Sequence, residues 1–126
     1  MSGMEKLIDD WVALWNSYDL SGLDALFLDD PTITYFSSEK DGLMVGLESI
    51  REHHVGFGFV NGGKESENKL WLEDTTIAQF GSTAVVSSIW FFRRATGETM
   101  RGPVTFVCAQ TDDGCRFVHM NFSNYK

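Results

Sequence analysis

The last third of the chain decides the fold. Residues 83–124 read TAVVSSIWFFRRATGETMRGPVTFVCAQTDDGCRFVHMNFSN. Three runs rich in β-branched and aromatic residues, 83–94, 99–110 and 115–124, are separated by turn signals at Thr96-Gly97 and Asp113-Gly114. A further run over 66–77 precedes a turn at Gly81. Consecutive long strands joined by tight turns predict an antiparallel meander.

The part of the chain before this meander predicts helices and a short hairpin. Apolar residues recur at helical spacing over 4–18, and Ser21 with Asp24 has the spacing of a capping box that opens a short helix ending at Asp29-Asp30-Pro31. A third helix is expected over 47–57, after strands at 32–36 and 43–45. Helices first and strands last favour an α+β class, with three N-terminal helices on the concave face of a curved, mostly antiparallel sheet.

Composition limits the classes of function. A length of 126 residues fits a single domain, 1–126. The formal net charge of −8 disfavours nucleic acid as a partner, because phosphate binding needs clustered basic residues. No apolar run reaches the roughly 20 residues that span a bilayer, and residues 1–10 lack the features of a signal peptide. We therefore expect a cytoplasmic protein without membrane contact.

The two cysteines lie on either side of the turn 111–114. If this four-residue loop closes a hairpin, Cys115 faces Gln110 and Cys108 faces Phe117. The cysteines are then neighbours on one face and not a cross-strand pair, so two half-buried thiols are expected instead of a disulfide.

Folding the meander on its turns predicts which side chains share a face. One face carries Ser87, Phe91, Arg93, Phe106, His119 and Asn121. The opposite face carries Trp90, Phe92, Met120 and Phe122 and is equally apolar. Three helices cover only one side of a sheet, so we expect the second face to form a homodimer, packed sheet to sheet.

Several segments resemble the nuclear transport factor 2-like superfamily. They are residues 11–36, residues 46–54 and the closing stretch DGCRFVHMNFS at 113–123. The last stretch is similar to the final strand of SnoaL-like proteins and of the calcium/calmodulin-dependent kinase II association domain, with Asn121 in place of a second His. The resemblance implies a cystatin-like, cone-shaped barrel with a pocket inside the cone.

The same superfamily contains the ketosteroid isomerases, which Asn16, Asp19 and residues 50–52 resemble. That alignment implies that the isomerase's catalytic positions fall on Trp11, Tyr35 and Phe106. Proton abstraction beside a carbonyl needs a carboxylate base and donors for the enolate, and these side chains do not supply them. Steroid isomerase chemistry is therefore disfavoured.

His119 is the candidate general acid or base, with Tyr35 as a second candidate catalytic group. A histidine in a core with satisfied hydrogen bonds is the alternative for His119, and a surface position is the alternative for Arg93. The predicted ligand-binding residues line the pocket inside the cone: Trp11, Trp15, Tyr35, His54, Ser87, Phe91, Arg93, Phe106, His119 and Asn121. We expect no metal, because only His54 and His119 meet, and no cofactor.

Three functions remain open from the sequence. The first is a protein that binds a small apolar or aromatic ligand inside the cone. The second is a small isomerase, cyclase or dehydratase that uses His119. The third is a homo-oligomeric assembly module. The same fold serves each of them, so the residues of the site must decide.

Overall fold

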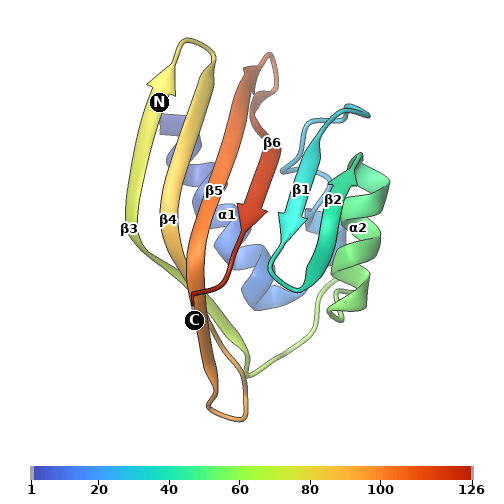
Figure 1. Cartoon of the computed structure of the whole chain (residues 1–126). Helices are drawn as coiled ribbons and strands as arrows, with labels where there is room; N and C mark the ends of the chain where they lie inside the picture. Colours follow the sequence, from blue (N-terminus) through green and yellow to red (C-terminus); the bar gives the residue numbers. More distant parts are fainter. Residues whose placement is uncertain (1, 126) are drawn as a thin grey trace.

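A computed structural model describes residues 2–125 (Figure 1). The elements in chain order are α1 (Ser2–Ser17), the 3-10 helix η1 (Leu20–Gly22), β1 (Thr34–Ser37), β2 (Lys40–Val45), α2 (Leu47–Gly56), β3 (Lys69–Phe80), β4 (Thr83–Arg93), β5 (Thr99–Thr111) and β6 (Gly114–Phe122). The α+β class is confirmed. None of the helices within residues 2–125 is long and apolar enough to cross a membrane.

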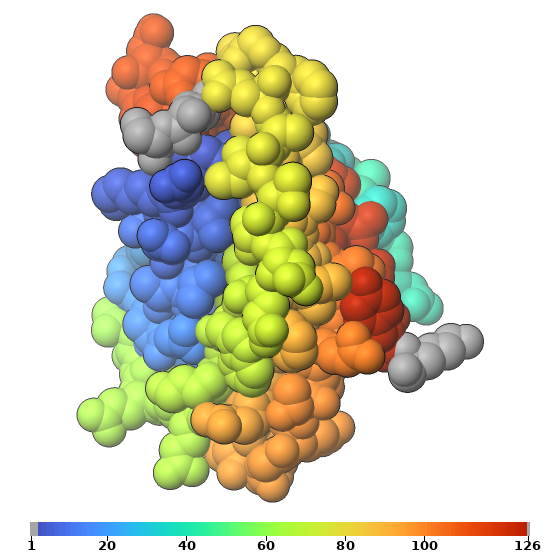
Figure 2. All heavy atoms as spheres, turned by 90° about the vertical axis from the view of Figure 1, so that its left-hand side faces the viewer, coloured from blue at the N-terminus to red at the C-terminus, as the bar shows by residue number. Residues whose placement is uncertain are grey.

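The six strands form one sheet in the order β2-β1-β6-β5-β4-β3. All neighbouring strands are antiparallel except β1 and β6, which run parallel. Figure 1 shows α1 lying across one face of this sheet and α2 beside β2. We call the face under α1 the inner face and the opposite one the outer face. Figure 2 shows β3, the edge strand, running alongside α1.

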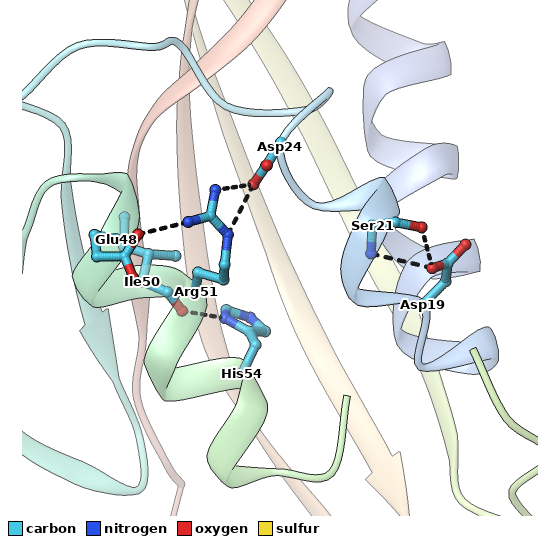
Figure 3. Close-up of polar contacts among 7 residues, drawn as sticks. All are labelled: Asp19, Ser21, Asp24, Glu48, Ile50, Arg51 and His54. Atoms are coloured by element: carbon cyan, nitrogen blue, oxygen red, sulfur yellow. Dashed lines mark hydrogen bonds and ion pairs between the residues drawn. The ribbon is translucent and has the colours of Figure 1, made fainter. Parts of the chain in front are cut away.

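The predicted short helix over residues 21–27 is wrong, because that segment forms only η1 followed by turns. The capping box does not form. Asp19 Oδ1 instead accepts hydrogen bonds from the backbone N–H of Ser21 at 3.1 Å and of Gly62 at 2.9 Å. Asp24 pairs with Arg51 of α2 at 2.6 Å (Figure 3). These long-range bonds hold the segment in a turn and tie it to α2.

The predicted inward and outward faces of β4 are exchanged. Arg94 N–H donates to Glu98 O at 2.8 Å, and Gly97 has φ 94°, so Ala95 to Gly97 form a three-residue hairpin loop. A two-residue turn at Thr96-Gly97 would pair the strands one position out of step. A one-residue slip sends every side chain to the other face.

The actual pairing, with Ser88 opposite Val104, turns Trp90 and Phe92 to the inner face. It turns Ser87, Phe91 and Arg93 to the outer face. The proposed dimer contacts of Trp90 and Phe92 are therefore misplaced, and so are the three predicted pocket positions on β4.

The end of β6 is inverted by a bulge. Cys115 faces Gln110 and Cys108 faces Phe117, as the four-residue loop predicts, but His119 then pairs with Val107. Val118 is the extra residue that an antiparallel bulge inserts, and beyond it the alternation changes sides. Met120 and Phe122 are buried on the inner face, so the prediction that they form an outer dimer surface is wrong. His119 and Asn121 lie on the outer face instead of in the pocket.

Gly102 on β5 lies opposite Trp90, where the chain after β6 crosses closely. The Trp90 indole N–H donates to the Ser123 carbonyl at 2.8 Å, and a Cβ on Gly102 would overlap that carbonyl oxygen. Because the overlap is with backbone, Gly102→Ala should lower the free energy of unfolding by about 2 kcal/mol. Urea unfolding followed by tryptophan fluorescence measures this.

The matched control is Gly56→Ala at the end of α2, where an added Cβ meets no atom within 4 Å. Its free energy of unfolding should stay within about 0.5 kcal/mol of wild type. Equal effects of the two substitutions would contradict the close approach at Gly102.

Candidate functional site

A hollow of about 110 Å³ opens between the end of α1, the β1–β2 hairpin and the inner face of the sheet. Its walls are aromatic: Trp15, Tyr18, Tyr35, Phe57, Trp90, Phe92 and Phe122. Its polar lining consists of Ser37, Ser38, Glu39, Asn68 and Arg94. Pockets for drug-sized ligands measure roughly 300–1,000 Å³, whereas a cavity of about 150 Å³ holds benzene. In this conformation the hollow therefore suits a compound of about one ring.

The elements that carry the aromatic walls are those that the sequence pattern predicts. The strand register then decides which of their side chains face the hollow. Trp15 lies one turn after Trp11 on the buried side of α1. Tyr35 is the inward residue of β1, and its ring stacks on that of Phe122 at 6.0 Å. Asn68 fixes the polar lining, because its amide donates to the Tyr18 hydroxyl at 3.0 Å and its carbonyl accepts from Ala95 N–H at 2.9 Å.

His54 lies behind this wall and is fully buried. Gly46, with φ 88°, starts α2 at an angle that turns His54 into the core. The ring Nδ1 bonds to the Ile50 carbonyl at 2.8 Å (Figure 3). A carbonyl only accepts, so Nδ1 carries the hydrogen and Nε2 of the neutral ring presents a lone pair. Burial lowers the pKa of His54 to about 4, so near neutral pH this residue is an uncharged hydrogen-bond acceptor.

Four buried ring nitrogens have no hydrogen-bond partner within the described part of the chain: Trp11 Nε1, Trp15 Nε1, His53 Nε2 and His54 Nε2. The rings that carry them are neighbours, and the His53 and His54 centroids are 5.5 Å apart. The His54 ring centroid lies 5.6 Å from Trp11, 5.5 Å from Trp15 and 5.6 Å from Tyr35. Each buried polar atom without a partner costs about 1–3 kcal/mol. The cluster is therefore unusual for a simple core and adjoins the hollow through Trp15 and Tyr35.

Burial also changes the acidity of the side chains around His54. It raises the pKa of the Tyr35 hydroxyl, which stays protonated. It lowers the pKa of the half-buried His53, and the nearby positive charge of Lys40 lowers that pKa further. The wall of the hollow is therefore uncharged at neutral pH, and only Glu39 and Arg94 in its polar lining carry charge.

The predicted site residues divide into three groups. Trp15 and Tyr35 line the hollow. Trp11, His54 and Phe106 are fully buried behind it, with the Trp11 and Phe106 rings 6.3 Å apart. The outer face holds Ser87, Phe91, Arg93, His119 and Asn121.

The two candidate catalytic residues are not brought together. His119 Nδ1 is hydrogen-bonded to Thr34 Oγ1 at 2.7 Å, and Thr34 is the β1 residue opposite it. Tyr35, the next residue along β1, points to the inner face. The sheet therefore separates the His119 ring from the Tyr35 hydroxyl.

Sequence reasoning missed five wall residues: Trp90, Phe92, Phe57, Tyr18 and Phe122. The signal for the first two is the length of the β4–β5 loop, since a three-residue loop with glycine in its last position reverses the faces of β4. Within residues 2–125 no group of three or more His, Cys, Asp or Glu side chains is arranged to hold a metal ion.

No protein-family model matches the sequence, and no curated protein matches it by sequence. Solved structures do match its fold. A nuclear transport factor 2-like superfamily protein from Salmonella enterica has a TM-score of 0.77 at 25% identity, over 96% of this chain and 87% of that one. The CaMKII hub of S. rosetta has a TM-score of 0.76 at 23% identity, over 98% and 95% of the two chains.

An uncharacterised protein with a cystatin-like fold from Caulobacter vibrioides has a TM-score of 0.79 at 14% identity, over 99% of this chain and 89% of that one. The architecture is thus the cystatin-like α+β fold. The chain has the fold of the nuclear transport factor 2-like superfamily, which confirms the resemblance seen in the sequence.

The buried His54 predicts an acid-sensitive fold. The unfolded chain protonates this imidazole near pH 6.5, whereas its pKa in the folded protein is about 4. The unfolded state therefore binds the extra proton as the pH falls through this window, and the free energy of unfolding should drop by about 3 kcal/mol. Urea unfolding at a series of pH values from 7.5 to about 4 measures the slope.

His54→Phe should remove most of this pH dependence, whatever it does to stability at pH 7.5. His53→Gln, at a less buried imidazole, should remove a smaller part. The same slope in wild type and His54→Phe would show that the drop arises elsewhere.

Proposed function

We propose that the protein binds a small apolar or aromatic ligand in the hollow, without steroid isomerase chemistry. The aromatic wall with its narrow polar lining is the observation that carries this function. Binding pockets combine apolar walls with a few fixed polar groups that orient the ligand. Ligand rings would stack on side chains such as Trp15, Phe92 and Phe122.

The chemistry of the walls supports binding more than catalysis. The positions that the isomerase resemblance marks as catalytic hold Trp11, Tyr35 and Phe106. General acid–base catalysis needs a titrating group within hydrogen-bond reach of the reacting atom. Among the walls Tyr35 has a raised pKa, and His119 lies on the far side of the sheet. No observation favours the enzyme over the binding protein.

The binding function is tested by thermal shift and calorimetry with single-ring compounds such as toluene, 4-methylphenol and indole. Stabilisation of the wild type is expected, since a ligand that binds only the folded state raises the melting temperature. Met100→Trp should abolish this stabilisation. Met100 is half-buried and lines the hollow, so a larger side chain there fills the space that the ligand needs.

Ser87→Trp is the matched control, because Ser87 is exposed on the outer face of β4. It should leave the shift unchanged. Stabilisation that survives Met100→Trp but not Ser87→Trp would place binding on the wrong side of the sheet and refute the proposal.

We also propose that the outer face of the sheet forms a homodimer. Apolar side chains lie on it without a covering helix: Phe36, Leu43, Val45, Trp71, Ile89, Phe91 and Val107. The Trp71 and Phe91 rings stack at 5.3 Å, which makes one flat aromatic surface. An exposed apolar patch of this kind is typical of a subunit interface. The likeness to a CaMKII hub adds support for self-association.

Ile89→Glu, near the middle of the outer face, should convert the dimer to a monomer, since a carboxylate without a partner is costly to bury. Val55→Glu is the control, because Val55 is equally apolar and 50% exposed on α2. Analytical ultracentrifugation over a hundredfold concentration range gives the readout. This interface is refuted if the wild type is a monomer at every concentration. It is also refuted if the wild type is a dimer and Ile89→Glu remains a dimer like Val55→Glu.

A further inference from the structure

We propose that the ligand carries a hydroxyl group, which accepts a hydrogen bond from the Trp15 indole and donates one to His54 Nε2. A neutral, single-ring phenol is the simplest member of this class. This inference rests on the proposed binding function and names the chemistry of its polar end. It assigns a use to two of the four buried ring nitrogens that have no partner within residues 2–125.

The donor is the indole N–H of Trp15. Its ring forms part of the hollow's wall, while its Nε1 is buried and has no partner within residues 2–125. An indole nitrogen only donates hydrogen bonds. The ligand atom that meets it must therefore be an acceptor.

The acceptor is Nε2 of His54. Because Nδ1 is committed to the Ile50 carbonyl at 2.8 Å, the free lone pair of the neutral ring is on Nε2. Trp15 and His54 are neighbours, with ring centroids 5.5 Å apart at an interplanar angle of 63°. The donor and the acceptor therefore belong to neighbouring rings.

This pairing selects among ligand groups. A hydroxyl accepts and donates through one oxygen, so it satisfies both nitrogens. An ether or a ketone accepts from Trp15 and leaves Nε2 unpaired. An ionised carboxylate only accepts, so it cannot donate to Nε2 even where Arg94 of the polar lining balances its charge. An ammonium group donates to Nε2 and leaves the Trp15 N–H unpaired.

The hydroxyl reaches His54 between Trp15 and Tyr35. Both rings line the hollow, and both lie against the imidazole, with centroids 5.5 and 5.6 Å from it. His54 Nε2 is closed off from the hollow, so these two side chains must separate for contact. The ring of the ligand then occupies the aromatic space beside Phe92 and Phe122, where about 110 Å³ is open.

The experiment compares three ligands of similar shape on the full chain. 4-Methylphenol donates and accepts, 4-methylanisole only accepts, and toluene does neither. We expect 4-methylphenol to bind about tenfold more tightly than 4-methylanisole by calorimetry, the factor of roughly one net hydrogen bond, and toluene to bind more weakly than 4-methylanisole. 4-Methylphenol and 4-methylanisole, which both accept, should shift the Trp15 indole N–H resonance downfield in an NMR spectrum assigned with Trp15→Phe, and toluene should not.

His54→Phe keeps a ring of similar size and removes the acceptor. In this variant the preference for 4-methylphenol over 4-methylanisole should disappear. If His54→Phe does not fold, the three-ligand comparison and the Trp15 resonance of the wild type decide the question alone.

The outcomes separate the two proposals. Equal affinities for all three ligands overturn the hydroxyl site and leave the binding function standing. Equal affinities for 4-methylphenol and 4-methylanisole, with toluene weaker, overturn the role of His54. If none of the three ligands binds, both the single-ring binding function and this inference are overturned.

Discussion

The structure depends on the burial of Trp11. This side chain of α1 is fully buried, and its ring contacts rings from α1, the segment after η1, α2, β5 and β6: Trp15, Phe27, His54, Phe106, Phe117 and Phe122. Most of these contacts are edge-to-face, at centroid distances typical of favourable aromatic pairs. One residue therefore sets the height and angle at which the helix crosses the sheet. The hollow lies one helical turn further along, at Trp15, where the packing is incomplete.

Hydrophobic patterning predicts the elements well because it depends only on local spacing. The helix over 4–18 and the long strands are present within a few residues of their predicted bounds. The predicted helix over 21–27 is absent because Asp19 and Asp24 bind residues far along the chain, Gly62 and Arg51. Propensity carries no information about such long-range partners.

The faces of the strands are harder to predict, because they depend on the parity of each loop and bulge. The β4–β5 loop is one residue longer than the predicted two-residue turn. This difference puts Trp90 on the inner face and Ser87 on the outer face, the reverse of the prediction. Before the bulge at Val118 the odd-numbered residues of β6, such as Phe117, point inward. After the bulge the even-numbered residues, such as Phe122, point inward. Both faces are apolar in composition, so hydrophobicity alone could not reveal either error. Helical spacing has no comparable parity, so α2 forms close to its predicted bounds and buries His54.

The corrected register changes what the polar residues do. With His119 held by Thr34 on the outer face, the buried polar atoms without a partner on the helix-covered side are ring nitrogens of Trp11, Trp15, His53 and His54. A purely apolar ligand would leave the Trp15 and His54 nitrogens unpaired. The sheet keeps this neutral site apart from the outer face, since Phe91 and Phe92 are adjacent on β4 and point opposite ways. The proposed self-association on one side and the proposed ligand discrimination on the other can therefore change independently through alternate residues of the same strands.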